Sequence, residues 1–416
     1  MLVWPQEFDG LDAWVTGAHA RVHLTHERIH RPAEWVVSGS LEDLKHRWPL
    51  ARVEGDRLIL DVGVVMAAPE SIAATLASRG VPLDAIGLSR SGERCDPLGG
   101  EATLRERKLT FVETLRGADD AVLPLDVLAL ASETGLAPSE ELLATLEARS
   151  GNLLRACRHR VRRALTRLLV GRYPSEALDI LEQVRGLAMV LPEVQSMVGL
   201  HKSSRYHHKD VWDHTRQVVR QAIPEAGLRW AALLHDIGKP FTRSFEPPRT
   251  VHFFRHDELG AVMFEGIAVR LRFEDPEAAR IGRLIGAHLR ANLYARTWTD
   301  AAVRRFHQEL GDTFEDLMHL SRADVTSKRP GRRREAIHNL YDLRCRVSQI
   351  KVADALRKPC IPKGLGAAIS AALGIAPGPV IGDLRRLCEE AVRDGRLPAD
   401  PTVEACVSFL RSIEAA

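Results

Sequence analysis

The chain has 416 residues, of which 45% are hydrophobic and 27% are charged, and its formal net charge is +3. This composition excludes a disordered chain, and the length predicts roughly two to four domains. No stretch approaches the ~18 consecutive apolar residues of a membrane span, and the first residues lack the pattern of a secretion signal.

The N-terminal part predicts a small α/β domain. Up to about residue 120, short β-branched runs alternate with turn signals and with helix-like segments such as SLEDLKHRW and PESIAATLASRG. From Pro124 onward, amphipathic runs broken by Pro and Gly predict helices almost throughout.

Two arginine-rich blocks stand out from the nearly neutral average charge. Such blocks can bind phosphates, but solvated helix faces explain each block equally well, so RNA binding stays one of two interpretations. The blocks consist of Arg155, Arg158, Arg160, Arg162, Arg163, Arg167 and Arg172, and of Lys328, Arg329, Arg332, Arg333 and Arg334.

Cysteine usage predicts a reducing compartment. The cysteines show no CxxC spacing, and a chain of this length does not need disulfides to be stable. We therefore expect a cytoplasmic protein; its cysteines are Cys95, Cys157, Cys345, Cys360, Cys388 and Cys406.

Residues 206–239 carry the clearest chemical signal in the chain. His214 precedes an adjacent His235-Asp236 pair at the end of an apolar run, and Gly238 and Lys239 follow. Imidazole and carboxylate groups gathered beside a buried segment are typical of a divalent metal site, with Mn, Ni, Co, Fe or Mg as candidate ions. We expect a metal-centred hydrolytic site here.

Several short sequence motifs extend this signal over most of the chain. Residues 87–112 read GLSRSGERCDPLGGEATLRERKLTFV, and later segments read LPEV, YHHKDVWDHT, WAALLHDIGKP, HFFRHDELGA, LIGAHLR and SRADV. In their order, these segments resemble the bacterial tRNA nucleotidyltransferase (CCA-adding enzyme) and poly(A) polymerase family with an HD domain.

The resemblance implies an α+β multi-domain fold. We expect a small nucleotidyltransferase-like head at residues 1–123, a helical neck at 124–200, an HD domain at 201–330 and a helical tail with possible RNA binding at 331–416. RNA or a nucleotide phosphoester is the expected partner, no membrane is expected, and the oligomeric state stays open.

The head departs from the family at its catalytic positions. Where the family has Gly-Gly and Arg-Asp, this chain reads Gly17-Ala18 and Arg21-Val22-His23. Where it has Asp-x-Asp, this chain reads Ala33-Glu34-Trp35, and Arg79 alone matches a later basic pair. Because nucleotidyl transfer needs two carboxylates on one strand to hold two metal ions, we expect a degenerate head. Asp61 is either a leftover carboxylate or a solvent-facing strand residue.

The HD pattern, by contrast, is complete. Resemblance to the HD superfamily implies one or two divalent ions and assigns catalytic roles to Asp236, Lys239 and His256. A surface lysine is the alternative for Lys239, and pocket roles for His207, His208, His252 and Arg255 stay open. The implied metal ligands are His214, His235, Asp236, His256, His288 and Asp324.

Three functions follow as alternatives. The leading expectation is a metal-dependent HD phosphohydrolase, either a phosphatase or a 2′,3′-cyclic phosphodiesterase, acting on RNA 3′ ends or nucleotides. The second is a tRNA nucleotidyltransferase with a diverged head, and the third is a tRNA-binding protein without enzymatic activity.

Overall fold

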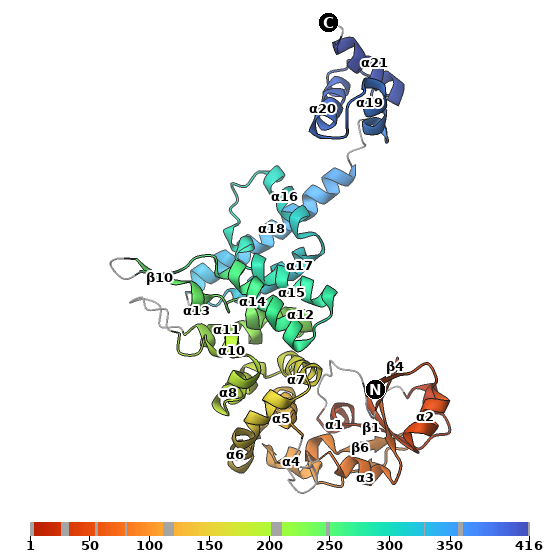
Figure 1. Cartoon of the computed structure of the whole chain (residues 1–416), viewed down its shortest axis with the longest axis vertical. Helices are drawn as coiled ribbons and strands as arrows, with labels where there is room; N and C mark the ends of the chain where they lie inside the picture. Colours follow the sequence, from red (N-terminus) through yellow and green to blue (C-terminus); the bar gives the residue numbers. More distant parts are fainter. Residues whose placement is uncertain are drawn as a thin grey trace. The chain divides into compact units, whose positions relative to one another are not determined.

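Figure 1 shows the computed structural model of the chain, which describes residues 4–25, 33–54, 57–79, 81–110, 120–200, 210–246, 250–327, 329–356 and 361–414. The chain divides into two compact units. The first consists of Met1–Arg296 and Leu310–Leu340, and the second of Thr297–Glu309 and Tyr341–Ala416.

A mixed β-sheet forms the centre of the N-terminal part. Among the described residues, seven strands pair in the order β3-β4-β5-β2-β1-β6-β7. Only the β2–β5 pair is parallel, with Glu34 opposite Val64 and Val36 opposite Met66. The strands are β1 (Ala13–Thr16), β2 (Glu34–Ser38), β3 (Arg52–Glu54), β4 (Arg57–Leu60), β5 (Gly63–Ala68), β6 (Gly87–Ser89) and β7 (Arg94–Cys95).

Alternation along β2 separates the two faces of this sheet. Trp35 and Val37 pack with Leu44 of α2 (Leu41–Arg47). Val36 packs on the other face with Leu76 of α3 (Ile72–Ala77). Because side chains alternate along a strand, Glu34 lies on the same face as Val36. The head also contains α1 (Ala18–Thr25), α4 (Gly100–Glu106) and the short strand β8 (Lys108–Leu109), which pairs with β9 (Ala137–Pro138).

Helices follow the sheet, as the sequence predicts. Proline in the first turn begins several of them, where its missing N–H costs no hydrogen bond, and the side chains of Asp210 and Glu225 cap two others. The helices of the first unit are α5 (Leu123–Thr134), α6 (Glu140–Arg149), α7 (Arg158–Val170), α8 (Pro174–Gln183), α9 (Gly186–Val190), α10 (Pro192–Gln195), α11 (Val211–Gln221), α12 (Ala226–Leu234), α13 (Lys239–Thr242), α14 (His256–Leu271), α15 (Asp275–Ala287) and α17 (Phe314–Asp324).

A β-hairpin interrupts these helices, against the expectation of a wholly helical second part. Strand β10 (Arg243–Glu246) pairs antiparallel with β11 (Thr250–Phe253). Its β-branched and aromatic residues favour a strand, and the hairpin lies beside α13 in Figure 1.

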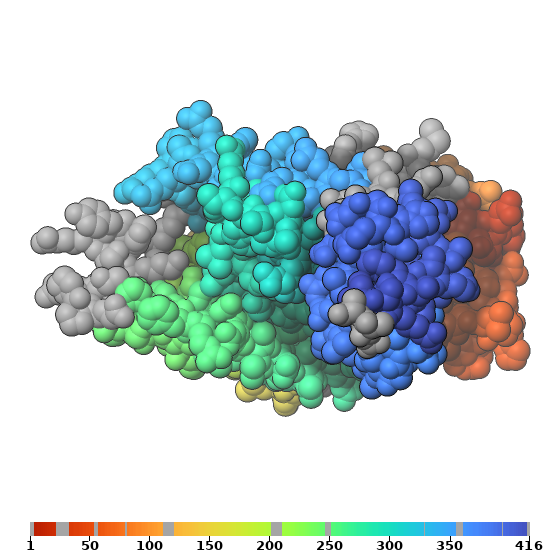
Figure 2. Space-filling view, turned by 90° about the horizontal axis from the view of Figure 1, so that it is seen from above, coloured from red at the N-terminus to blue at the C-terminus, as the bar shows by residue number. Residues whose placement is uncertain are grey.

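The second unit has a small core of its own. Helices α19 (Leu365–Leu373), α20 (Pro379–Arg393) and α21 (Val403–Glu414) bury Leu365, Ile369, Cys388 and Cys406 against one another. In Figure 2 the three helices, coloured dark blue, form one continuous lobe. The unit also holds most of α16 (Asp300–Leu310), while the long α18 (Pro330–Leu356) begins in the first unit and ends in the second.

The fold class predicted from the sequence, an α/β head followed by helical parts, is confirmed by this architecture. In the part of the chain that the structure describes, no helix combines the length and the hydropathy needed to cross a membrane.

Candidate metal centre

Five helices deliver the six predicted metal-ligating side chains. His214 lies on α11, His235 and Asp236 directly follow α12, His256 begins α14, His288 directly follows α15, and Asp324 ends α17. Five of the six lie at or just beyond a helix end, where the chain can turn a side chain toward a common centre.

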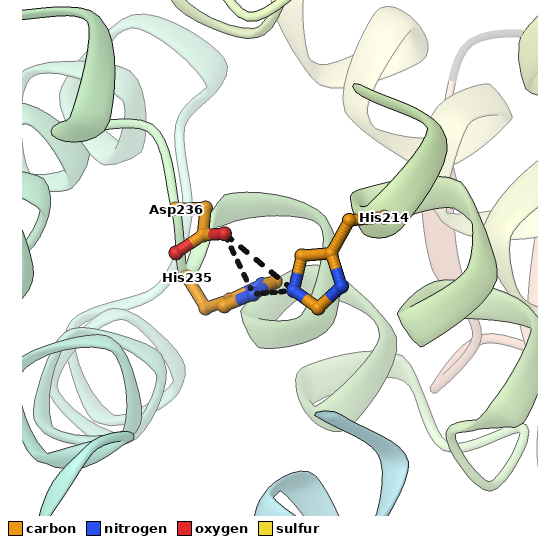
Figure 3. A group of neighbouring side chains, drawn as sticks. All are labelled: His214, His235 and Asp236. Atoms are coloured by element: carbon orange, nitrogen blue, oxygen red, sulfur yellow. Dashed lines mark hydrogen bonds and ion pairs between the residues drawn. The ribbon is translucent and has the colours of Figure 1, made fainter. Parts of the chain in front are cut away.

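His214, His235 and Asp236 form the first group of three (Figure 3). Asp236 Oδ2 lies 3.3 Å from His235 Nε2 and 3.6 Å from His214 Nε2. The two imidazole Nε2 atoms are 3.3 Å apart. Asp324 extends this group, because its Oδ1 lies 3.0 Å from His214 Nε2.

His256 and His288 form a second group with the other oxygen of Asp236. Asp236 Oδ1 lies 3.4 Å from His256 Nε2 and 3.8 Å from His288 Nε2. Asp236 therefore faces both groups, one oxygen to each, which is the arrangement of a carboxylate that can bridge two ions.

Backbone carbonyl groups orient three of the four imidazoles. The Nδ1 atom of His235 donates to Ala232 O at 2.9 Å, that of His256 to Phe253 O at 2.7 Å, and that of His288 to Ile285 O at 2.7 Å. Because a carbonyl oxygen only accepts, Nδ1 carries the proton and Nε2 turns its lone pair toward Asp236. Such a second hydrogen bond is what fixes a metal-binding histidine.

Thr326 holds the fourth imidazole, since its Oγ1 lies 3.0 Å from His214 Nδ1. Sequence reasoning missed this residue. Its only signal was its place two positions after Asp324, and a threonine there is an ordinary residue at the end of a helix.

Burial and neighbouring charge set the protonation of the site. Burial lowers the pKa of His288 to about 4, helped by the charge of His235, and burial also lowers the pKa of His214. Burial would raise the pKa of Asp236, but His235 and Lys239 outweigh it and hold that pKa well below its usual value. Burial would lower the pKa of His235 as well, but the charge of Asp236 outweighs it and raises that pKa. A metal ion binds the neutral form of an imidazole, so binding at His235 would displace its proton.

The donor set fits a divalent ion. Asp236 Oδ1 and His256 Nε2 are buried and have no hydrogen-bond partner among the described residues. Leaving such atoms unsatisfied is costly, and a cation between them would satisfy both.

Lys239 is part of this site and not a surface lysine. It is 8% exposed, and its Nζ lies 2.5 Å from Asp236 Oδ2. It neutralises the buried carboxylate from the first turn of α13.

The remaining pocket candidates differ from one another. Arg255 turns to solvent and donates to Glu258 at 2.8 Å, so it does not line the site. The ring of His252 stacks on Phe254, with centroids 5.0 Å apart. His207 and His208 lie outside the described residues.

Gly238 permits the close packing that brings the two groups together. A Cβ atom at this position would lie 2.2 Å from the carbonyl oxygen of His256. Only glycine lets the start of α13 approach the start of α14 this closely.

In the head, Arg79 lies against Glu34 on one face of strand β2. Arg79 Nη1 lies 3.5 Å from Glu34 Oε2, and Arg79 Nη2 lies 3.0 Å from Thr16 Oγ1 and 3.5 Å from Met66 Sδ. The neighbouring position on the same face is the apolar Val36.

A buried cluster of opposite charges adjoins this face. Arg21 pairs with Asp84 at 2.9 Å and with Glu133 at 3.0 Å, and Arg167 pairs with Glu133 at 2.6 Å. Arg79 joins the cluster by donating to the backbone oxygen of Asp84 at 2.8 Å. The carboxylates around Glu34 thus bind arginines of the chain itself.

The residues of the head therefore do not fit a two-ion site. Among the described residues, Glu34 is the single carboxylate that strand β2 carries, and an arginine lies against it. Asp61, the other candidate, is exposed in the turn between β4 and β5, so it belongs to no strand.

Three arginines of the first block form ion pairs within the chain. Arg162 donates to Glu277 at 3.0 Å, and Arg160 donates to Asp120 at 3.0 Å. Together with the buried Arg167, these contacts tie α7 to its neighbours. In the second block, Arg332, Arg333 and Arg334 are exposed at the start of α18.

The chain is similar to a known domain family and to curated tRNA nucleotidyltransferases. An HD domain family matches residues 211–329. A CC-adding tRNA nucleotidyltransferase of Thermus thermophilus is 31% identical over 75% of this chain and 72% of its own, and an A-adding tRNA nucleotidyltransferase of Deinococcus radiodurans is 31% identical over 78% and 76%.

Solved structures agree on the fold. The Bacillus stearothermophilus CCA-adding enzyme, determined in complex with CTP, covers 99% of this chain with a TM-score of 0.56 at 17% sequence identity. This likeness concerns the arrangement of the elements.

These relatives contradict the leading functional expectation. An HD phosphohydrolase, whether phosphatase or cyclic phosphodiesterase, is wrong as the main function, because the curated relatives that span most of the chain are transferases. The prediction gave too much weight to the complete HD motif, which is one part of a chain whose relatives match it over three quarters of its length.

Proposed function

Because this chain belongs to the family of bacterial tRNA nucleotidyltransferases with an HD domain, we propose that it acts on tRNA as a nucleotidyltransferase with a diverged head. The observation that carries the proposal is the 31% identity over three quarters of the chain to enzymes named for adding CC and A to tRNA. The mixed sheet followed by helices supports it, because the fold is that of the CTP-bound neighbour.

The chain offers a basic surface for such a partner. Arg332, Arg333 and Arg334 are exposed on consecutive positions of α18. Arginine side chains bind phosphate oxygens through charge and paired hydrogen bonds, so this segment supports contact with an RNA backbone.

One observation favours a second candidate function, which is tRNA binding without nucleotide transfer. Transfer by two metal ions needs carboxylates that are available to those ions, whereas Glu34 faces Arg79 and has Val36 as its neighbour on the strand.

Nucleotide incorporation separates the two candidates. Full-length protein is incubated with labelled CTP or ATP and with tRNA transcripts that lack CCA, CA or A at the 3′ end. Incorporation by the wild type that is lost in Glu34→Gln supports the transferase, and the accepting transcript identifies the nucleotide added. Salt-sensitive tRNA binding without incorporation supports the second candidate and overturns the first.

We propose further that the HD residues bind one or two divalent ions, with His214, His235, Asp236 and Asp324 at one position and Asp236, His256 and His288 at the other. A divalent ion held there would supply positive charge for phosphate oxygens. Asp236 would face both positions, and Lys239 would balance its charge through the contact with Oδ2.

Metal stoichiometry tests this ligand set. The content of Mn, Co, Ni, Fe and Mg is measured by mass spectrometry after dialysis against each ion, for wild type, Asp236→Asn and His288→Ala. We expect Asp236→Asn to lose all bound metal, whereas His288→Ala loses only the second ion. Equal metal content in wild type and Asp236→Asn contradicts the proposal.

The division into head, neck, HD domain and tail at residues 123, 200 and 330 stays a proposal, as does a cytoplasmic location. The HD family match at 211–329 supports the limits of the third part.

A further inference from the structure

The β10–β11 hairpin connects two residues of the candidate metal centre. Lys239 precedes it, and His256 follows it. Two contacts fix its base: Phe253 O accepts the hydrogen bond from His256 Nδ1, and Lys239 Nζ lies 5.8 Å from the centre of the Phe253 ring. The base of the hairpin thus keeps a defined position beside the site.

Exposed aromatic rings gather on this hairpin and at its base. Phe241, Phe245 and Phe254 are 60%, 65% and 61% exposed, and in the described part of the chain they are the phenylalanines with the most exposed surface. Phenylalanine is usually buried, so three such rings within fourteen residues call for a partner.

Both faces of the hairpin pair a ring with a basic or polar group. On one face Arg243 lies opposite Phe253, and its guanidinium lies 4.8 Å from the centre of the Phe245 ring. On the other face the imidazole of His252 stacks on Phe254 with an interplanar angle of 6°. The hairpin therefore presents flat rings next to cations, and not a purely apolar surface.

This combination matches the chemistry of unpaired nucleotides. Every base has a flat face that stacks on an aromatic ring without regard to sequence, and nearby arginine and lysine side chains attract the phosphates. An apolar protein partner would need neither the cations nor the parallel imidazole.

We propose that the hairpin binds the single-stranded 3′ end of an RNA by stacking its unpaired bases on Phe245 and Phe254. Arg243 attracts the phosphates on the side that carries Phe245. This inference rests on the proposed function, because it takes tRNA as the partner.

Fluorescence tests the proposal on the full chain. The probe is a tRNA transcript with 2-aminopurine at a 3′-terminal unpaired position, and a second probe has that end covered by a complementary strand. We expect the wild type to quench 2-aminopurine and to bind the free end more tightly. Phe245→Ala and Phe254→Ala should each weaken binding of the free end about 5- to 100-fold and leave the covered probe unchanged.

Two matched variants separate stacking from structural damage. Phe254→Trp keeps a flat ring and should retain tight binding. Val269→Ala removes a side chain that is 80% exposed on α14, and it should bind like the wild type. Phenylalanine variants that bind the free end as tightly as Val269→Ala overturn the inference.

The failure of the inference differs from that of the proposed function. If the wild type binds both probes equally and does not quench 2-aminopurine, the hairpin proposal fails while tRNA binding stands. If the wild type binds neither probe, the proposed action on tRNA fails, and the hairpin proposal fails with it.

Discussion

Arg79 places its guanidinium 3.5 Å from the carboxylate of Glu34, on the face of the sheet that also carries Val36. Side chains of both residues are largely buried, with 11% and 22% of their surface exposed. The charge of the one carboxylate on β2 is thus balanced within the protein.

Removing Arg79 should therefore destabilise the head. Arg79→Met removes this counter-charge together with the hydrogen bonds of Arg79 to Thr16 and to the backbone oxygen of Asp84, and we expect the free energy of unfolding to fall by about 3 kcal/mol. Urea denaturation measures the loss. In the double variant Arg79→Met/Glu34→Gln part of the loss should be recovered, because the buried carboxylate charge is then absent; a double variant as unstable as the single one would contradict the pairing.

Gly238→Ala should disturb the metal centre through a steric contact. The added methyl group would meet the carbonyl oxygen of His256 at 2.2 Å, so α14 must shift and carry His256 away from Asp236. We expect a loss of about 1–3 kcal/mol in stability and weaker metal binding, seen by urea denaturation and by titration with Co²⁺.

Gly266→Ala is the matched control for this substitution. Gly266 lies on α14, the helix that Gly238→Ala is expected to displace, and an added Cβ at Gly266 would have open space. Alanine in a helix is favoured over glycine, so stability should rise by about 0.5–1 kcal/mol. A Gly238→Ala variant that behaves like Gly266→Ala would refute the close approach.

Stability should depend on pH through Glu225. Its side chain caps the N-terminus of α12, the helix that ends directly before His235 and Asp236. Burial would raise its pKa, but the hydrogen bond from Arg280 dominates and lowers the pKa below the ordinary value of 4.5. A carboxyl whose pKa is lower in the folded state binds fewer protons there, so its contribution is complete above about pH 4.5 and is lost as the pH falls.

Thermal unfolding between pH 6 and pH 3 measures this contribution. The melting temperature of the wild type should fall more steeply below about pH 4.5 than that of Glu225→Gln, which cannot titrate. Parallel curves for the two proteins would show that Glu225 contributes no such linkage.

The arginines at the start of α18 should set the salt dependence of tRNA binding. Replacing Arg332, Arg333 and Arg334 by glutamine removes three exposed charges, so the slope of log K against log salt should become shallower by about 2–3. Fluorescence anisotropy at several salt concentrations measures it. The triple lysine variant keeps the charges and should keep the slope; a glutamine variant with the wild-type slope would place the contact elsewhere.

The candidate metal centre was predictable because each of its six residues lies within a short, recognisable sequence motif. His235 and Asp236 are adjacent, and the other four were found by the order of their motifs. Thr326 was not predictable in this way, because its role depends on a contact with His214 across 112 residues of chain.

Long-range pairing also limits what a basic run in the sequence can reveal. Arg162 and Arg167 belong to a basic run in sequence, but Glu277 and Glu133, which pair with them, lie in distant segments and cannot be matched to them by pattern. The hairpin at β10–β11 was missed because its strands are short. The expected hydrolase was wrong for a different reason: a complete motif identifies a kind of site, whereas activity belongs to the whole chain.

The distance in sequence between His214 and Thr326 also bears on how the chain folds. Groups that meet across 112 residues come together only after a long loop has closed, and closing it costs entropy before any contact is formed. The five helices that carry the six side chains, α11, α12, α14, α15 and α17, must therefore assemble before the centre exists. A divalent ion would then act late in folding, slowing unfolding of the assembled helices more than it speeds their formation.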